Sequence, residues 1–258
     1  MVVMVLVVDI GNTDTKFGIF VDDELKARWA IHSDLNRNAD EHAVLLKAML
    51  AHVGGYDIEV AIVGSVVPVL TGPVAAAVED ATGCHPRIPE ADQVPSIQLE
   101  VDVPKQVGID RVANALAARE IYQAPAIVAD LGSVTTFDVV NASGNLAGVV
   151  IALGMQASAQ ALTAAGAQLP SVNLGRPAQL IGTNTTASMK SGIFWGYVHM
   201  VRGMLEELHQ DLGSDYTTIA TGGQAPLVVG DVGMFDIVDA DLTLMGLLLI
   251  EKACGRFI

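Results

Sequence analysis

The chain has 258 residues, of which 51% are hydrophobic and 17% are charged. This composition excludes a disordered chain and indicates several strands buried on both faces, in a chain long enough for one large domain or two modest ones. The formal charge of −15 repels polyanions, so neither nucleic acid nor an anionic membrane is an expected partner.

The first half opens with three short strands joined by tight turns, which predicts an antiparallel meander. Helices then alternate with one further buried strand. The predicted strands span residues 2–8, 16–20, 25–31 and 58–66, and the predicted helices span 41–53, 70–81 and 111–122. The proline-rich stretch 84–104 predicts a surface connection that could line a cleft.

The same order of elements returns about 120 residues later: an apolar strand, an Asp-x-Gly turn, a strand, a polar turn and a strand. The later predicted strands span 126–129, 135–140, 146–152, 217–220 and 235–238, and the helices span 155–165, 185–212 and 241–254. This repetition predicts an internal duplication with two domains, 1–120 and 121–258.

The chain ends and cysteines indicate a cytoplasmic protein. Cys84 and Cys254 lack metal-ligand spacing and are typical of thiols in a reducing compartment. The apolar segment Met1 to Val8 lacks a basic flank and runs directly into Asp9, which favours a buried strand over a signal peptide. The Leu-rich segment Leu242 to Ile250 is too short to span a bilayer.

The segment DIGNTDTK, Asp9 to Lys16, carries the strongest chemical signal. Because Gly11 has no Cβ, backbone amides in this turn can approach a phosphate closely. Thr13 and Thr15 add hydroxyl donors. Lys16 adds a point charge, and Asp9 is placed to hold Mg²⁺ through water. A simple hairpin turn is the alternative interpretation.

A second hydroxyl-rich turn, DLGSVTT, occupies the same place in the second half, at Asp130 to Thr136. Two such turns can clamp one nucleotide from both sides, which favours phosphate binding over two unrelated hairpins. Neither GxGxxG after a strand nor GxxxxGK[ST] is present, so Rossmann and P-loop sites are excluded. Thr221-Gly222-Gly223 either packs against an adenine or forms an ordinary strand–helix turn.

These paired loops resemble those of the superfamily of acetate and sugar kinases, heat-shock chaperones and actin. Across essentially the whole chain, the sequence resembles the type III pantothenate kinases. Besides Asp9 to Lys16, it has GxDR at Gly108 to Arg111, DxGTxxT at Asp130 to Thr136 with serine for threonine, and GxNTxxxxxSG at Gly182 to Gly192. The resemblance implies two duplicated actin-like (ribonuclease H-like) α/β domains with mixed sheets flanked by helices.

The resemblance also implies a reaction: ATP-dependent phosphorylation of pantothenate to 4′-phosphopantothenate, the first step of coenzyme A biosynthesis. It implies a homodimer that uses ATP, Mg²⁺ and a monovalent cation, K⁺ or NH₄⁺. The residues implied to contact ATP are Asp9, Ile10, Gly11, Asn12, Thr13, Asp14, Thr15, Lys16 and Ser133. Those implied to contact the acceptor are Gly108, Ile109, Asp110, Arg111 and Thr185, while Asp130 resembles the ligand of the monovalent cation.

Asp110 is the candidate general base for the acceptor hydroxyl, with helix capping as the alternative role. Arg111 would pair with the pantothenate carboxylate. Thr185 would reach the substrate amide or hydroxyl, and it is also a candidate cap for the helix that follows it.

Two positions depart from the family pattern. Val101 stands where the family usually has a tyrosine that contacts pantothenate, and it offers neither a hydroxyl nor a ring. The family's GGxIxPG stretch becomes Ala147 to Gly154, without one glycine and the proline. A non-catalytic nucleotide-binding relative with a regulatory role, or a kinase for another small hydroxy acid, therefore remains open at this point.

Overall fold

The computed structural model describes residues 3–166 and 169–255. These form two compact units. The first unit contains the described residues up to Ala117 together with those from Asp241 onward, and the second contains Ala118–Ala240. The chain therefore leaves the first unit within helix α3 (Ile109–Tyr122) and returns to it for its last helix.

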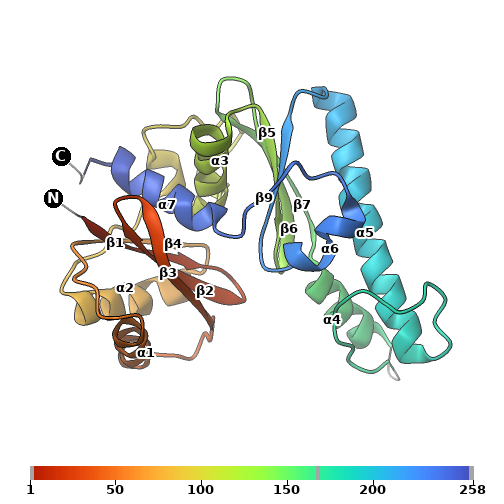
Figure 1. The fold of residues 1–258 in the computed structure, drawn as a ribbon, viewed down its shortest axis with the longest axis horizontal. Helices are drawn as coiled ribbons and strands as arrows, with labels where there is room; N and C mark the ends of the chain where they lie inside the picture. The colour runs from red at the N-terminus through yellow and green to blue at the C-terminus, as the bar shows by residue number, and fades with distance from the viewer. Residues whose placement is uncertain (1–2, 167–168, 256–258) are drawn as a thin grey trace. The chain divides into compact units, whose positions relative to one another are not determined.

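The first unit is built on a four-stranded mixed sheet in the order β3-β2-β1-β4 (Figure 1). The first three strands form the predicted antiparallel meander, and the fourth lies parallel to β1. The strands are β1 (Met4–Ile10), β2 (Asp14–Val21), β3 (Glu24–His32) and β4 (Val60–Ser65). Because β1 and β4 are parallel, their carboxyl ends lie at the same edge of the sheet.

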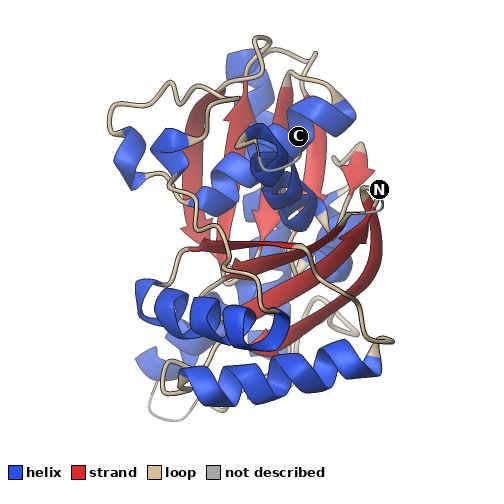
Figure 2. Cartoon of the chain, turned by 90° about the vertical axis from the view of Figure 1, so that its left-hand side faces the viewer, coloured by secondary structure: helices blue, strands red, loops and turns tan. Residues whose placement is uncertain are grey.

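Helices cover both faces of this sheet. On one face, α1 (Ala39–His52) and α2 (Pro68–Thr82) lie side by side beneath the curved sheet, as Figure 2 shows. α1 begins with a capping box in which Asn38 and Glu41 each bind the other's backbone N–H. α7 (Leu242–Ala253) packs on β1, β2 and β4.

The proline-rich stretch 84–104 is more than the surface connection predicted from sequence. Arg87 pairs with the edge strand β4, since its N–H donates to Ala61 and its carbonyl accepts from Val63, both at 2.8 Å. Further on, Val94 and Ile97 are buried. Two short 3₁₀ turns, Ala91–Gln93 and Pro104–Gln106, follow Arg87. The stretch thus covers part of the sheet edge.

The second unit repeats the same plan in a five-stranded sheet of order β7-β6-β5-β8-β9. Its first three strands are antiparallel and the last two add in parallel. The strands are β5 (Ala126–Leu131), β6 (Val134–Val140), β7 (Leu146–Leu153), β8 (Thr217–Thr221) and β9 (Ile237–Val238). A meander followed by a parallel strand in both units is the duplication that the sequence predicted.

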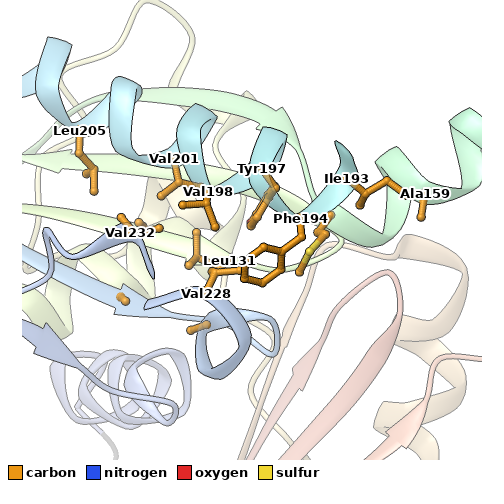
Figure 3. Packing of buried hydrophobic residues seen from close by; sticks show 14 of the residues in the cluster. Leu131, Ala159, Ile193, Phe194, Tyr197, Val198, Val201, Leu205, Val228 and Val232 are labelled. Atoms are coloured by element: carbon orange, nitrogen blue, oxygen red, sulfur yellow. The ribbon is translucent and has the colours of Figure 1, made fainter. Parts of the chain in front are cut away.

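Three helices pack with this second sheet: α4 (Met155–Ala165), α5 (Thr185–Leu212) and α6 (Ala225–Val232). Figure 3 shows how Phe194, Tyr197 and Val201 of α5 pack with Leu131 of β5 and Val228 of α6. α4 and α5 have the bounds predicted from sequence, whereas the eight-residue α6 was expected only as the helix after the Thr221-Gly222-Gly223 turn, without predicted bounds. Within the part of the chain that the structure describes, no helix has the length and apolarity needed to cross a membrane.

Candidate active site

The segment Asp9 to Lys16, called the first loop from here on, joins β1 to β2 as a tight turn. The Gly11 N–H donates to the Asp14 carbonyl at 3.1 Å, and a Cβ on Gly11 would lie 3.1 Å from that same oxygen. Asn12 and Asp14 are exposed on the turn. The loop therefore presents its central residues to solvent while its ends stay fixed in the sheet.

Asp9 and Lys16 lie opposite each other on neighbouring strands at the base of the turn, where they are register partners in the β1–β2 pair. Asp9 is 8% exposed, whereas Lys16 is half-buried and forms no ion pair among the described residues. The described residues include no cluster of three or more potential metal ligands. The carboxylate of Asp9 fits Mg²⁺ that arrives with a nucleotide, because this ion keeps waters and binds one or two carboxylates plus phosphates.

The hydroxyl of Thr15 points into the protein rather than toward the exposed side of the turn. Thr15 is fully buried, and its Oγ1 lies 2.9 Å from Oγ of Ser33, the residue that follows β3. Ser33 also donates from its backbone N–H to the Thr13 carbonyl at 2.8 Å and from its hydroxyl to the Gly11 carbonyl at 2.7 Å. The end of β3 thus braces the first loop.

The GxDR segment lies next to the first loop within the same unit. The Val66 N–H, just after β4, donates to the carbonyl of Ile10 at 3.1 Å. A Cβ built on Gly108 would lie 3.1 Å from Cγ1 of Val66. Val66 therefore links the end of β1 to the start of α3, so the structure brings together the first loop and the candidate base.

Asp110 and Arg111 interact directly at the start of α3. Asp110 Oδ1 accepts from the backbone N–H of Arg111 at 2.9 Å and from its guanidinium Nη1 at 3.1 Å. A Cβ on Gly108 would lie 2.3 Å from Oδ1 and 2.9 Å from Nη1. The glycine of this motif therefore leaves room for both charged side chains to fold back over it.

The helix begins at Ile109, so Asp110 lies inside its first turn rather than at the cap position considered from the sequence. Its side chain is 23% exposed and that of Arg111 is 17% exposed. Both groups are therefore partly accessible to a small molecule. Val101 lies half-buried, just before the 3₁₀ turn that leads into this segment.

In the second unit, the segment Asp130 to Thr136, called the second loop from here on, is held by neighbouring loops. The Gln224 N–H donates to the Leu131 carbonyl at 2.8 Å, and the Gly154 N–H donates to the Ser133 carbonyl at 3.2 Å. Ser133 itself is half-buried. At the start of β6, Thr135 bonds the Tyr197 hydroxyl at 2.6 Å, which ties the strand to α5. Burial raises the pKa of Tyr197 to about 12, so its phenol stays neutral.

The Thr221-Gly222-Gly223 turn lies against the second loop, between β8 and α6. Gly222 has a φ of +92°, a conformation that favours glycine, and a Cβ there would lie 2.4 Å from Oδ1 of Asp130. Thr221 is fully buried, and no hydrogen-bond partner for its hydroxyl occurs among the residues described. The glycine thus allows the turn to approach the Asp130 carboxylate.

Thr185 is the first residue of α5 and is exposed. The cap is the preceding Asn184, whose side chain accepts from the Ala187 N–H at 2.9 Å. Capping, the other role considered for Thr185, therefore belongs to Asn184. The Thr185 hydroxyl makes no hydrogen bond within the described residues.

Comparison with known proteins decides the family. The family model for type III pantothenate kinases matches residues 5–207. A type III pantothenate kinase from Rhodospirillum centenum is 43% identical over 256 residues, covering 96% of this chain and 98% of that protein. The chain belongs to the type III pantothenate kinase family. The relative from Moorella thermoacetica is 38% identical and covers 96% of this chain and 99% of its own.

Solved structures with the same fold confirm the actin-like class. An activator of 2-hydroxyisocaproyl-CoA dehydratase from Clostridium difficile aligns with a TM-score of 0.56 at 14% identity, covering 98% of this chain and 96% of its own. A glucokinase of the ROK family from Streptomyces griseus aligns with a TM-score of 0.52 at 13% identity, covering 95% and 97%. At these identities the likeness establishes the fold alone.

For this member of the pantothenate kinase family, sequence reasoning missed the residues that brace the loops. Ser33, Gln224 and Gly154 all bond loop backbone. Gly154 ends the family stretch noted at Ala147 to Gly154, and Ser33 had a detectable signal of its own. In the predicted meander, the third strand returns beside the first loop, so a polar residue at its end was a candidate neighbour of that loop.

Proposed function

We propose that this protein transfers the γ-phosphoryl group of ATP to the 4′-hydroxyl of pantothenate, giving ADP and 4′-phosphopantothenate. The observation that carries this proposal is the position of Asp110: it lies beside the first loop, within reach of an arginine and partly accessible. Membership of the pantothenate kinase family supports the identity of the acceptor.

Both Asp-x-Gly loops contact ATP in this proposal. Lys16 neutralises phosphate charge, which is supported by its lack of an ion pair within the described residues. The proposed ATP contacts are Asp9, Ile10, Gly11, Asn12, Thr13, Asp14, Thr15, Lys16 and Ser133. Because the Thr15 hydroxyl is bonded to Ser33, Thr15 contributes through its backbone. Bound Mg²⁺, held by Asp9 and water, would neutralise charge on the phosphates.

Asp110 accepts the proton of the acceptor hydroxyl as the new oxygen–phosphorus bond forms. The bond from the γ-phosphorus to the bridging oxygen breaks, and ADP leaves with its electron pair. Arg111 binds the pantothenate carboxylate, and Gly108, Ile109 and Thr185 line the acceptor. The guanidinium has five N–H donors, so it can hold Asp110 and a substrate carboxylate together. Val101 supplies packing only, which predicts weaker acceptor binding than a tyrosine would give.

Asp130 is proposed as the ligand of a monovalent cation, K⁺ or NH₄⁺. Support comes from Thr221, its register partner across the parallel β5–β8 pair. The buried Thr221 hydroxyl, without a hydrogen-bond partner in the described residues, is an additional oxygen at this position. A carboxylate and a neutral hydroxyl are suitable oxygen ligands for a weakly hydrated cation.

We further propose that the protein is a cytoplasmic homodimer. Val134, Ile151 and Leu153 are 42%, 64% and 60% exposed on neighbouring strands of the second unit. Val134 and Leu153 are register partners, and Ile151 is two residues from Leu153 on the same face. An exposed apolar row of this kind supports contact with a second copy.

The test is ADP release by the purified protein with ATP and Mg²⁺, with and without pantothenate. We expect pantothenate-dependent release, faster in K⁺ or NH₄⁺ than in Na⁺ at equal ionic strength. The phosphorylated product should be identified by mass spectrometry. ATP binding without any pantothenate-dependent turnover would contradict the proposal and favour a non-catalytic relative. Turnover with another hydroxy acid, but not with pantothenate, would show that the acceptor is a different compound. Equal rates in the three salts would contradict the proposed cation site.

A further inference from the structure

Ser33 makes three hydrogen bonds to the first loop. Its N–H donates to the Thr13 carbonyl at 2.8 Å, its hydroxyl donates to the Gly11 carbonyl at 2.7 Å, and its Oγ lies 2.9 Å from that of Thr15. Ser33 has one hydroxyl hydrogen, which goes to Gly11, so Thr15 must be the donor of the third bond. Ser33 is 6% exposed, so these bonds are shielded from water.

These bonds fix the direction of two peptide groups in the turn. In a planar trans peptide the C=O and the N–H of the next residue point in opposite directions. Because the Gly11 and Thr13 carbonyls point toward Ser33, the N–H groups of Asn12 and Asp14 point away from it. Asn12 and Asp14 are also the exposed residues of the turn. Neither amide is therefore engaged by Ser33, and the residues that carry both amides are accessible to an anion.

We propose that Ser33 is a positioning residue, which orients the Asn12 and Asp14 amides of the first loop toward a phosphate group of ATP. This inference rests on the proposed function in taking ATP as the ligand. Ser33 does not touch the nucleotide. It acts by preventing the two peptide groups from rotating, so that the donors are already oriented when the phosphate arrives.

The direct test is ATP binding to Ser33→Ala, measured by calorimetry with Mg²⁺. Loss of the hydroxyl frees the Gly11 carbonyl and leaves Thr15 without its acceptor. We expect about tenfold weaker ATP binding, with the pantothenate KM unchanged. Ser33→Thr keeps the hydroxyl and should restore most of the affinity.

A matched control separates positioning from loss of stability. The Thr82 hydroxyl, in the same unit but at the end of α2, donates to the Val78 carbonyl at 2.7 Å and accepts from the Cys84 N–H at 3.1 Å. Thr82→Val also removes one hydroxyl with two hydrogen bonds. It should lower Tm to a similar extent and leave ATP binding unchanged. If Ser33→Ala binds ATP as tightly as Thr82→Val does, Ser33 has only a structural role.

A second measurement uses the unmodified protein and remains informative if Ser33→Ala does not fold. Amide hydrogen exchange should slow at Asn12 and Asp14 when ATP binds, while the Ser33 amide is protected with or without ATP. Unchanged exchange at both loop amides in saturating ATP would overturn the inference. ATP binding alone is read out here, so a failure to phosphorylate pantothenate would refute the proposed function and not this one.

Discussion

The carboxylate of Asp110 is oriented by its immediate neighbour in the chain. Oδ1 accepts two bonds from Arg111, one from its backbone and one from its side chain. The two side chains are only 23% and 17% exposed. The pair therefore sets the orientation of the carboxylate before a substrate arrives.

Asp110→Asn should lower turnover at least a hundredfold, since a general base typically contributes about 10²–10⁴ in rate. The amide oxygen can still accept from the Arg111 N–H, so the helix start and ATP binding should be preserved. Single-turnover kinetics and ATP calorimetry measure the two effects separately. Asp102→Asn, at an exposed carboxylate nearby, is the control and should be neutral. Near-normal turnover in Asp110→Asn would show that Asp110 is not the general base and serves only to bind Arg111.

Among the secondary-structure elements, α1 contains a buried histidine in an unfavourable environment. His42 is 3% exposed, and neither ring nitrogen has a hydrogen-bond partner among the described residues. Burial, followed by the nearby positive charge of Arg37, lowers the pKa of His42 below its ordinary value of 6.5, while Glu41 and Asp34 oppose the shift. The folded protein therefore takes up the proton less readily than the unfolded chain.

This histidine predicts acid sensitivity. As the pH falls below 6.5, the unfolded state binds the proton first, so the free energy of unfolding decreases. Above pH 6.5 the histidine is neutral in both states, and its protonation no longer lowers the free energy of unfolding. His42→Leu should add roughly 1 kcal/mol at neutral pH by removing unsatisfied polar atoms, and more at pH 5.5. Urea denaturation across this range measures the slope. His52→Gln, exposed on the same helix, is the control, and a slope unchanged by His42→Leu would contradict the assignment.

Elements that are defined by local sequence could be predicted, whereas elements that depend on contacts between distant residues could not. α4 and α5 matched the predicted bounds because local periodicity and flanking glycines define them. The bounds of α6 were not predicted because its eight residues contain mostly apolar side chains and a glycine, which give little helical pattern. The pairing of Arg87 with β4 depends on residues more than twenty positions away, which no local pattern records.

The residues of the candidate site also divide into those recognisable from local motifs and those defined by contacts between distant residues. Gly11 and Gly108 were recognisable because both belong to short motifs with a local geometric requirement. The bond of Ser33 to Gly11 crosses 22 residues, and the bond of Gln224 to Met155 crosses 69. Such contacts become visible only when the register of the sheet or the packing of the loops is known.

For the whole molecule, the apolar row of Val134, Ile151 and Leu153 predicts the oligomeric state. Ile151→Glu places a carboxylate in the proposed interface of a protein with a charge of −15, so it should convert the dimer to a monomer. Sedimentation velocity measures this change. The control is Val238→Glu, at a 53% exposed position on β9, at the opposite edge of the same sheet. A monomeric parent protein, or a dimeric Ile151→Glu, would contradict the proposed interface.

The return of the chain to its first unit has a consequence for protein synthesis. Leu244, Leu247 and Leu248 of α7 are buried in that unit, but they are translated after all of the second unit. On the ribosome, the second unit therefore has its full sequence available before the first, which reverses the usual N-terminal-first order. Until α7 emerges, the face of the first sheet that this helix covers remains open on the nascent chain and available to a chaperone.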